Sequence, residues 1–160
     1  MKKIIYIDMD NTLADYLSEV KARNVSPEDG KRIKGFFRSL KPMPEAIESY
    51  NLLAKYFDVY ILSTAPWSTP TSLVEKMEWI KEYLPSAYKN VIFSHHKELN
   101  IGDYLIDDST KNGAGEFTGM HIQIGSEKFP DWPSVVAFIL NREKITDLKV
   151  DPWVKIFYEN

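Results

Sequence analysis

The chain has 160 residues, of which 44% are hydrophobic and 27% are charged, a composition typical of a globular domain rather than of a disordered chain. It contains no cysteine, which excludes disulfide bonds, cysteine-type zinc sites and thiol catalysis. Its net charge of −3 argues against a protein that coats a nucleic acid polymer, and no apolar stretch approaches the ~18 residues needed to span a membrane.

The first apolar run is followed at once by two aspartates. Lys3–Ile7 is short and rich in β-forming residues, a pattern typical of a buried strand, so Asp8 and Asp10 concentrate negative charge where that strand leaves the sheet. Unpaired buried charge is costly, and the pair therefore requires a cation. We expect a divalent metal ion at this place, with a phosphate beside it.

The segment that follows is longer than an ordinary connection within a compact domain. Within it, Leu13–Ala22 is expected to be helical, and Pro27–Phe37 is expected to form a second helix. We interpret this segment as a small helical cap, about residues 14–41, inserted after the first strand and lying over the strand ends. Cations outnumber anions from Ser18 to Lys41, which favours either attraction of a small anionic substrate or a solvated helical face.

After the cap, helical patterns and strand-like runs alternate along the chain. The expected helices are Pro44–Tyr56, Ser72–Tyr83 and Pro133–Arg142, and the expected strands are Val59–Leu62, Val91–Phe93, Tyr104–Ile106 and His121–Ile124. This alternation predicts an α/β fold with a Rossmann-like parallel sheet and helices on both faces.

Polar side chains follow four of the five expected strands. In sheets of this kind, ligands bind outside the carboxyl ends of the strands, so these groups are expected to meet at one edge. They are Asp8 and Asp10, then Ser63 and Thr64, then His95, His96 and Lys97, and finally Asp107 and Asp108.

The remaining expectations concern the chain as a whole. We expect a single domain over residues 1–160. Only a short apolar run follows Lys2 and Lys3, so no signal peptide is expected and we expect a cytoplasmic location. The apolar tail Val150–Asn160 is expected to pack on the domain or to form a dimer contact.

Four separated strings resemble the four motifs of the haloacid dehalogenase superfamily of phosphatases. Between residues 4 and 108 the sequence contains, in the order of those motifs, Asp8-x-Asp10-x-Thr12, Ile61-Leu62-Ser63-Thr64, Lys97 and Leu105-Ile106-Asp107-Asp108. Within this region, three strings also resemble the 5'(3')-deoxyribonucleotidases: Asp8-Met9-Asp10-Asn11-Thr12-Leu13-Ala14-Asp15, then Gly35-Phe36-Phe37 with Leu40-x-Pro42-x-Pro44, and the Leu105–Asp108 string.

The resemblance implies a role for each acidic residue. Asp8 would be the nucleophile that attacks phosphorus, and Asp10 would protonate the leaving oxygen and then activate water. Mg²⁺ would be held by Asp8, the backbone carbonyl of Asp10 and Asp107. Asp108 would lie beside the metal ion, outside its direct ligands.

The resemblance also implies which groups bind the phosphate. Ser63 would bond a phosphoryl oxygen, with Thr64 as the alternative because the Ser-Thr pair leaves two registers open. Lys97 would neutralise the phosphate and the nucleophile. The plain alternative for Lys97 is a solvated surface lysine.

The function that the resemblance implies is magnesium-dependent hydrolysis of nucleoside monophosphates, as by a 5'(3')-deoxyribonucleotidase, through an aspartyl-phosphate. Aromatic faces stack on nucleobases, so Phe36, Phe37 and Trp67 are candidates for the substrate pocket; alternatively, they pack the structure together. Two other functions stay open at this point. One is a phosphatase for a sugar phosphate or another small metabolite, and the other is a phosphoacceptor module without turnover.

Overall fold

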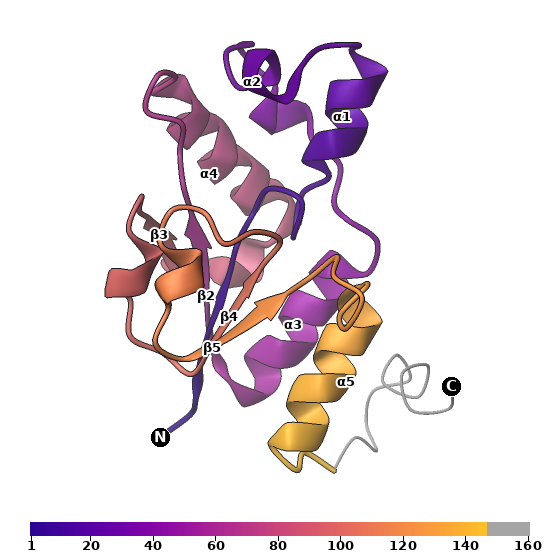
Figure 1. Cartoon of the computed structure of the whole chain (residues 1–160), viewed down its shortest axis with the longest axis vertical. Helices are drawn as coiled ribbons and strands as arrows, with labels where there is room; N and C mark the ends of the chain where they lie inside the picture. Colours follow the sequence, from indigo (N-terminus) through magenta and orange to yellow (C-terminus); the bar gives the residue numbers. More distant parts are fainter. Residues whose placement is uncertain (147–160) are drawn as a thin grey trace.

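A computed structural model describes residues 1–146 of the chain (Figure 1), and the predicted packing of the tail Val150–Asn160 lies outside the described residues. At its centre is a five-stranded parallel sheet with the strand order β3-β2-β1-β4-β5. The strands are β1 (Ile4–Ile7), β2 (Asp58–Ser63), β3 (Val91–Phe93), β4 (Tyr104–Asp107) and β5 (Met120–Gln123). Each overlaps a predicted strand, and the α/β Rossmann-like fold class is confirmed.

Three long helices share one hydrophobic core with one face of this sheet: α3 (Ala46–Tyr56), α4 (Thr71–Tyr83) and α5 (Trp132–Arg142). Helices α3 and α5 lie side by side (Figure 1). Because side chains alternate across a strand, Ile5 and Ile7 point into this core, whereas Tyr6 points to the opposite face.

The opposite face of the sheet lacks a comparable α-helix within residues 1–146. It carries a small cluster in which Tyr6 and Leu105 pack with Ala114 and Phe117, next to the 3-10 helix η4 (Ala114–Glu116). The helices predicted on both faces are therefore long α-helices on one face and the short 3-10 helix η4 on the other. The connections 94–103 and 108–119 are short and contain only the 3-10 helices η3 (Lys97–Leu99) and η4.

Capping residues determine where two of the long helices begin. Helix α5 begins one residue before the predicted Pro133, because Asp131 caps it: Asp131 Oδ1 accepts a hydrogen bond from the Ser134 backbone N–H at 3.0 Å, and Ser134 Oγ accepts one from the Asp131 N–H at 3.3 Å. Helix α3 begins at Ala46 rather than at the predicted Pro44, because Glu45 has a φ of 57°, outside the right-handed helical region.

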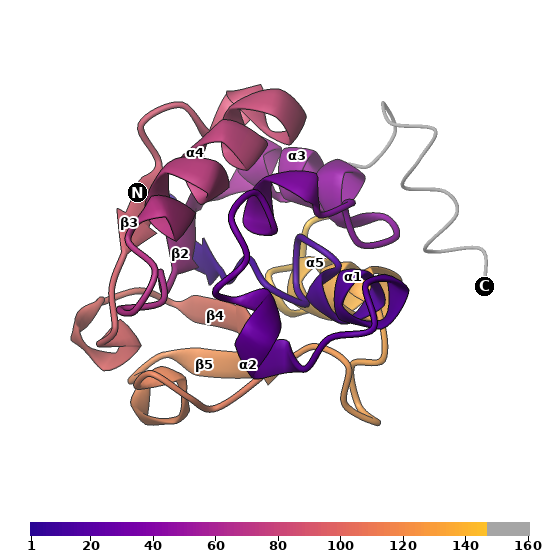
Figure 2. The same ribbon diagram turned by 90° about the horizontal axis from the view of Figure 1, so that it is seen from above.

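Residues 15–41 leave the sheet edge and return to it beside the point of departure. Ala14 forms an antiparallel bridge with Pro42, and the Asp15 N–H donates to Lys41 O at 2.8 Å. The inserted segment contains α1 (Tyr16–Ala22), α2 (Pro27–Gly30) and the 3-10 helix η1 (Phe37–Ser39). Seen from above, α2 lies over the ends of β4 and β5, and α1 lies over α5 (Figure 2). We call this segment the cap.

The helices of the cap are shorter than the sequence predicts. Helix α1 begins at Tyr16 instead of Leu13, because the Asp15 side chain accepts a hydrogen bond from Ser18 N and so caps the helix. The predicted helix Pro27–Phe37 ends at Gly30, and the chain then turns through Gly35 at a φ of 81°. This left-handed conformation suits glycine and ends regular helix.

Helix α4 holds the cap in place. Trp79 Nε1 donates a hydrogen bond to Leu40 O at 2.8 Å, and Glu75 accepts one from the Gly35 backbone N–H. On the exposed side, Arg38 pairs with Glu82. In residues 1–146, no helix combines the length and the apolar character that a membrane crossing requires.

Candidate active site

Most of the polar groups predicted at the strand ends line one pocket beneath the cap, a cavity of about 340 Å³; Ser63 and His96 do not line it. It lies at the carboxyl ends of the strands, where the rule for parallel sheets places ligands. The cap contributes Tyr16, Leu17, Pro27 and Lys31 to its wall. The predicted site residues that line it are Asp8, Asp10, Thr64, Lys97, Asp107 and Asp108.

Local structure aims the first two aspartates at this pocket. The Asp8 N–H donates to Ile106 O at 2.9 Å, which continues the ladder between β1 and β4. The chain then turns tightly: Asn11 has a φ of 56°, and the Leu13 and Ala14 N–H groups both donate to Met9 O. Asp8 and Asp10, at the end of β1 and in this turn, both line the pocket.

Lys97 lies between two of the aspartates. Its Nζ donates to Asp8 Oδ1 at 2.8 Å and to Asp107 Oδ2 at 2.5 Å, and its side chain is only 4% exposed. Burial alone would lower the pKa of Lys97, but the carboxylates of Asp8 and Asp107 together raise it above its ordinary value. The ammonium is therefore held in its charged form, next to the carboxylate predicted to be the nucleophile.

Asp8, Asp107 and Asp108 form a cluster in which one carboxylate oxygen from each residue lies within 4.8 Å of the other two. Burial, and after it the charge of Asp8, raises the pKa of Asp107 to about 6. Burial, the charge of Asp8 and that of Asp107 raise the pKa of Asp108 to about 7. The cluster therefore carries more negative charge than its protein surroundings neutralise.

The donor set fits a hard divalent cation. Four carboxylates lie in the pocket, and the two buried lysines pair with three of them: Lys97 with two and Lys76 with the third. When all these groups are ionised, the two buried ammonium groups leave two of the four negative charges unmatched, before the lysines at the pocket rim are counted. Mg²⁺ carries that charge and prefers oxygen ligands. Asp8 and Asp107 would hold it, together with the backbone carbonyl of Asp10, and Asp108 is close enough to join them.

Lys76 of α4 contacts the pocket residue Asp10 and is not among the site residues predicted from the sequence. Its Nζ donates to Asp10 Oδ2 at 2.9 Å, although the side chain is fully buried. Burial raises the pKa of Asp10, and the charge of Lys76 opposes that rise. Trp79 and Ile80 define the buried face of α4, and helical spacing from them points back to Lys76, which is the signal that could have found it.

The structure separates the two members of the Ser-Thr pair. Ser63 has no exposed surface, and its Oγ accepts a hydrogen bond from Lys76 Nζ at 2.9 Å. Thr64 lines the pocket, and its Oγ1 donates to Ser94 O at 2.7 Å. Of the two residues that the sequence leaves open, Thr64 lines the pocket and Ser63 does not.

The three aromatic candidates lie in different surroundings. Phe36 and Phe37 have no exposed surface and pack against Tyr16 in the hydrophobic core, so neither lines the pocket. Their side chains fix the cap to the domain. Trp67, in contrast, is 89% exposed, and its ring lies edge-on to that of His95 with the two centroids 6.1 Å apart.

A second hollow of about 480 Å³ adjoins the pocket and is mostly apolar. Trp67, Pro70, Leu73 and Phe93 line it, and Pro66 and His95 line both the hollow and the pocket. A ligand with its anionic end among the aspartates and lysines could therefore lay a planar group against Trp67.

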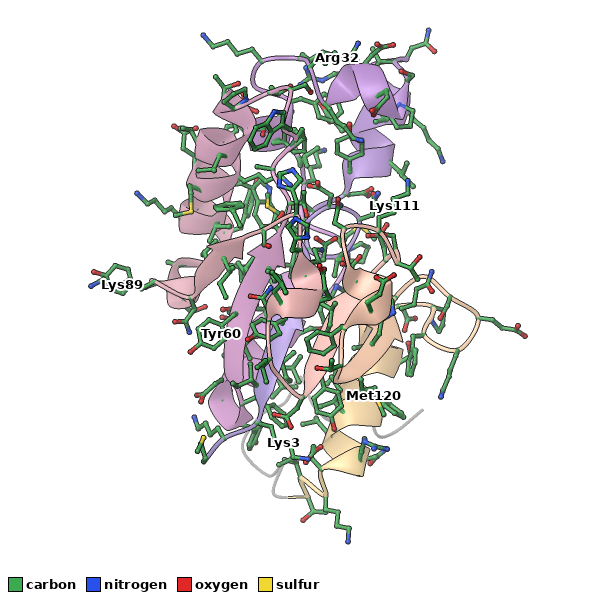
Figure 3. All side chains as sticks on the ribbon, turned by 60° about the vertical axis from the view of Figure 1, so that its left-hand side comes forward. Lys3, Arg32, Tyr60, Lys89, Lys111 and Met120 are labelled. Carbon is green, nitrogen blue, oxygen red and sulfur yellow. The ribbon has the colours of Figure 1, made fainter. Side chains whose placement is uncertain are left out.

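Two further cations lie at the rim of the pocket. Lys31 comes from the end of α2 in the cap, and Lys111 comes from the loop after β4. Figure 3 shows Lys111 between the body of the sheet and the cap, where Arg32 is labelled. The pocket thus combines a carboxylate cluster with three lysines: Lys97 between the aspartates, and Lys31 and Lys111 at the rim. This arrangement suits a phosphate ester whose charge must be neutralised during group transfer.

Comparison with known proteins adds to this geometry. A family model described as "5' nucleotidase, deoxy (Pyrimidine), cytosolic type C protein" matches residues 24–130. The chain is 49% identical to a Vibrio phage KVP40 protein assigned as a 5'(3')-deoxyribonucleotidase, over 89% of this chain and 88% of that protein. It is 34% identical to a Staphylococcus aureus (strain Mu50) protein with the same assignment, over 88% and 97%.

Solved structures also resemble the fold. Among them is the magnesium-bound structure of the HAD-hydrolase YfnB from Bacillus subtilis, with a TM-score of 0.54 over 81% of this chain and 90% of that chain. The two sequences are 12% identical, so this likeness concerns the fold alone.

Proposed function

The chain belongs to the deoxy (pyrimidine), cytosolic type C 5'-nucleotidase family, and we propose that it hydrolyses nucleoside monophosphates with the help of Mg²⁺ and through an aspartyl-phosphate on Asp8. Members of this family are phosphoric monoester hydrolases of the haloacid dehalogenase type. One observation carries the proposal: Asp8, Asp10, Thr64, Lys97 and Asp107, from four separate strand ends and connections, line a single pocket.

In the first step, a carboxylate oxygen of Asp8 attacks phosphorus. The new oxygen–phosphorus bond forms as the bond to the ester oxygen breaks, and the electron pair of that bond goes to the leaving oxygen. Asp10 gives its proton to this oxygen and becomes a carboxylate. Lys97 contacts Asp8 and offsets charge on the phosphoryl group. The Thr64 hydroxyl would bind one phosphoryl oxygen after its single proton turns away from Ser94 O.

In the second step, the Asp10 carboxylate takes a proton from a water molecule that attacks phosphorus. The bond between phosphorus and Asp8 breaks, its electron pair returns to the Asp8 carboxylate, and inorganic phosphate leaves. Asp10 is then protonated again, as the first step requires. Mg²⁺, when bound by Asp8, Asp107 and the Asp10 carbonyl, would neutralise phosphoryl charge and orient the ester.

The hollow beside the pocket supports a nucleotide as the substrate. An indole that is 89% exposed is costly in water but favourable as a stacking surface for a nucleobase. We therefore place the base against Trp67, while the sugar passes His95 and Pro66, which the hollow and the pocket share. In this proposal the cap, predicted from the sequence at about residues 14–41, belongs to one domain with the sheet and keeps water from the phosphate.

Release of phosphate from 4-nitrophenyl phosphate tests the chemistry. We expect activity with magnesium chloride, loss of activity with excess chelator, and loss of about four orders of magnitude or more in Asp8→Asn. Asp103→Asn is the control for a general loss of negative charge. Asp103 lies at the other end of β4 and accepts a hydrogen bond from the Ile4 N–H. Full activity of Asp8→Asn would contradict the covalent route.

A substrate panel decides between the candidate functions. We expect deoxythymidine 5'-monophosphate to be hydrolysed with a kcat/KM about tenfold or more above that of glucose 6-phosphate, because stacking of the base adds binding energy. Equal rates would favour a phosphatase for sugar phosphates or other small metabolites. A stable phosphorylated protein that releases no phosphate would favour a phosphoacceptor module, which the presence of Asp10 disfavours.

A further inference from the structure

Lys76 is a fully buried cation outside the motifs that define the proposed site. It lies on the inner face of α4, and its Nζ makes three hydrogen bonds: to Asp10 Oδ2 at 2.9 Å, to Ser63 Oγ at 2.9 Å and to Thr64 O at 2.8 Å. Its ammonium also lies 4.8 Å from the ring centroid of Phe37 in the cap. Lys76 thus joins the end of β1, the end of β2 and the cap.

These bonds exclude Lys76 as a phosphate ligand. An ammonium group has three N–H donors, and all three are engaged by the oxygens of Asp10, Ser63 and Thr64. A buried lysine is costly unless it is paired and hydrogen-bonded, and here it is both. Lys76 therefore acts on the site through the residues that it hydrogen-bonds: Asp10, Ser63 and Thr64.

The group that depends on it most is Asp10. Lys76 is the partner of Asp10 Oδ2, and Asp10 Oδ1 has no hydrogen-bond partner among residues 1–146. Without Lys76, neither oxygen of this carboxyl would be fixed by the described part of the chain. The same ammonium also donates to the Thr64 carbonyl, so Lys76 Nζ links Asp10 directly to the end of β2, where the phosphate is proposed to bind.

We propose that Lys76 is the positioning residue of the reaction, and that it holds the Asp10 carboxyl at the place where the leaving oxygen of the ester takes its proton. This inference rests on the proposed function. In the step concerned, the bond between phosphorus and the ester oxygen breaks, the electron pair goes to that oxygen, and the proton of Asp10 moves to it. Lys76 gains and loses no proton in this step.

Leaving groups of different basicity provide the test. Deoxythymidine 5'-monophosphate releases an alkoxide-like oxygen that needs the proton, whereas 4-nitrophenyl phosphate releases a weakly basic phenolate that hardly needs it. In Lys76→Met, we expect kcat/KM to fall about 100-fold for the nucleotide, as a misplaced catalytic group would cause, and less than about tenfold for the aryl ester. The ratio of the two values is the readout, since it cancels a general loss of active protein.

Lys81→Met provides the matched control, because it removes an exposed lysine from the same helix and should leave the ratio unchanged. Lys76→Gln keeps two N–H donors at this position and is measured in the same way. It takes the place of Lys76→Met if that variant unfolds at the assay temperature. Equal losses on both esters, or no loss on either, would overturn the positioning role alone. A wild-type protein that hydrolyses neither ester would overturn the proposed function, and the inference with it.

Discussion

At the scale of single residues, the site is organised by two lysines with separate tasks. Lys97 pairs with Asp8 and Asp107, where the phosphate and the metal ion are proposed to bind. Lys76 pairs with Asp10, where the proton is proposed to move. Because each ammonium is buried and hydrogen-bonded to its own carboxylates, neither lysine can replace the other when one is removed.

Thr64 and Ser63 give a prediction that distinguishes two neighbouring hydroxyls. Thr64→Val keeps the shape of the side chain but removes the hydroxyl and its hydrogen bond to Ser94 O, so we expect kcat/KM to fall about tenfold and the free energy of unfolding to fall by only about 1 kcal/mol. Ser63→Ala removes an acceptor of the buried Lys76 and should lower the free energy of unfolding by about 1–3 kcal/mol. Steady-state kinetics and urea denaturation of both variants measure the difference; the reverse order of effects would assign the phosphate to Ser63.

The residues of the site differ in how far the sequence could predict them. Asp8 and Asp10 are visible because two acids directly after a buried strand are a local anomaly. Lys76 is not, because a lysine within a helix is ordinary until the buried face of that helix is known. Nor could the sequence show that Phe36 and Phe37 would lie in the core, since burial of an aromatic residue depends on tertiary packing.

At the scale of elements, the cap is a short, turn-rich segment held by α4. The sequence predicted two helices in it, and the second is cut short at Gly30 because the chain turns at Gly35. Helix propensity favoured a longer helix, but the contacts of Glu75 with the Gly35 N–H and of Trp79 with Leu40 O determine the path. Those contacts are not visible in a local pattern.

The cationic rim gives a prediction for this element. Lys31 lines the pocket and is partly neutralised by Glu28 at 2.8 Å, so we expect Lys31→Met to raise the KM for a nucleotide about two- to fivefold with kcat unchanged. The difference should shrink as salt is added, because salt screens exposed charges. Lys34→Met is the control, since Lys34 is an exposed cation of the same segment that does not line the pocket. An identical KM increase in both variants would mean that only the overall charge of the cap matters.

At the scale of the whole molecule, the parallel sheet brings together groups that are far apart in the sequence. The sequence was enough to predict five strands, because each contains a short apolar run, although α-helices separate only β1 from β2 and β2 from β3. It was not enough to predict that all three long helices lie on one face. That outcome depends on the connections between the strands. From β1 to β2 and from β2 to β3 the chain passes through α-helices. It then crosses to β4 and β5, on the other side of β1, through connections that contain only 3-10 helices.

The charge of the assembled site predicts how magnesium affects the stability of the molecule. Folding raises the pKa of Asp107 to about 6 and that of Asp108 to about 7, from about 3.9 in the unfolded chain. In this range the folded state holds more protons than the unfolded state, so the contribution of these groups is fully present below pH ~4 and is lost as the pH rises to ~7. Mg²⁺ competes with the same protons.

We therefore expect saturating magnesium chloride to raise the melting temperature little at pH 5 and clearly more at pH 8. Scanning calorimetry with and without the ion, at matched ionic strength, measures the difference. Asp108→Asn removes one of the titrating carboxyls and should make the magnesium effect less dependent on pH, whereas Asp103→Asn, outside the pocket, should leave it unchanged. A magnesium effect of equal size at both pH values would mean that the ion does not bind at the carboxylates of the pocket, because only there does it displace protons over this range.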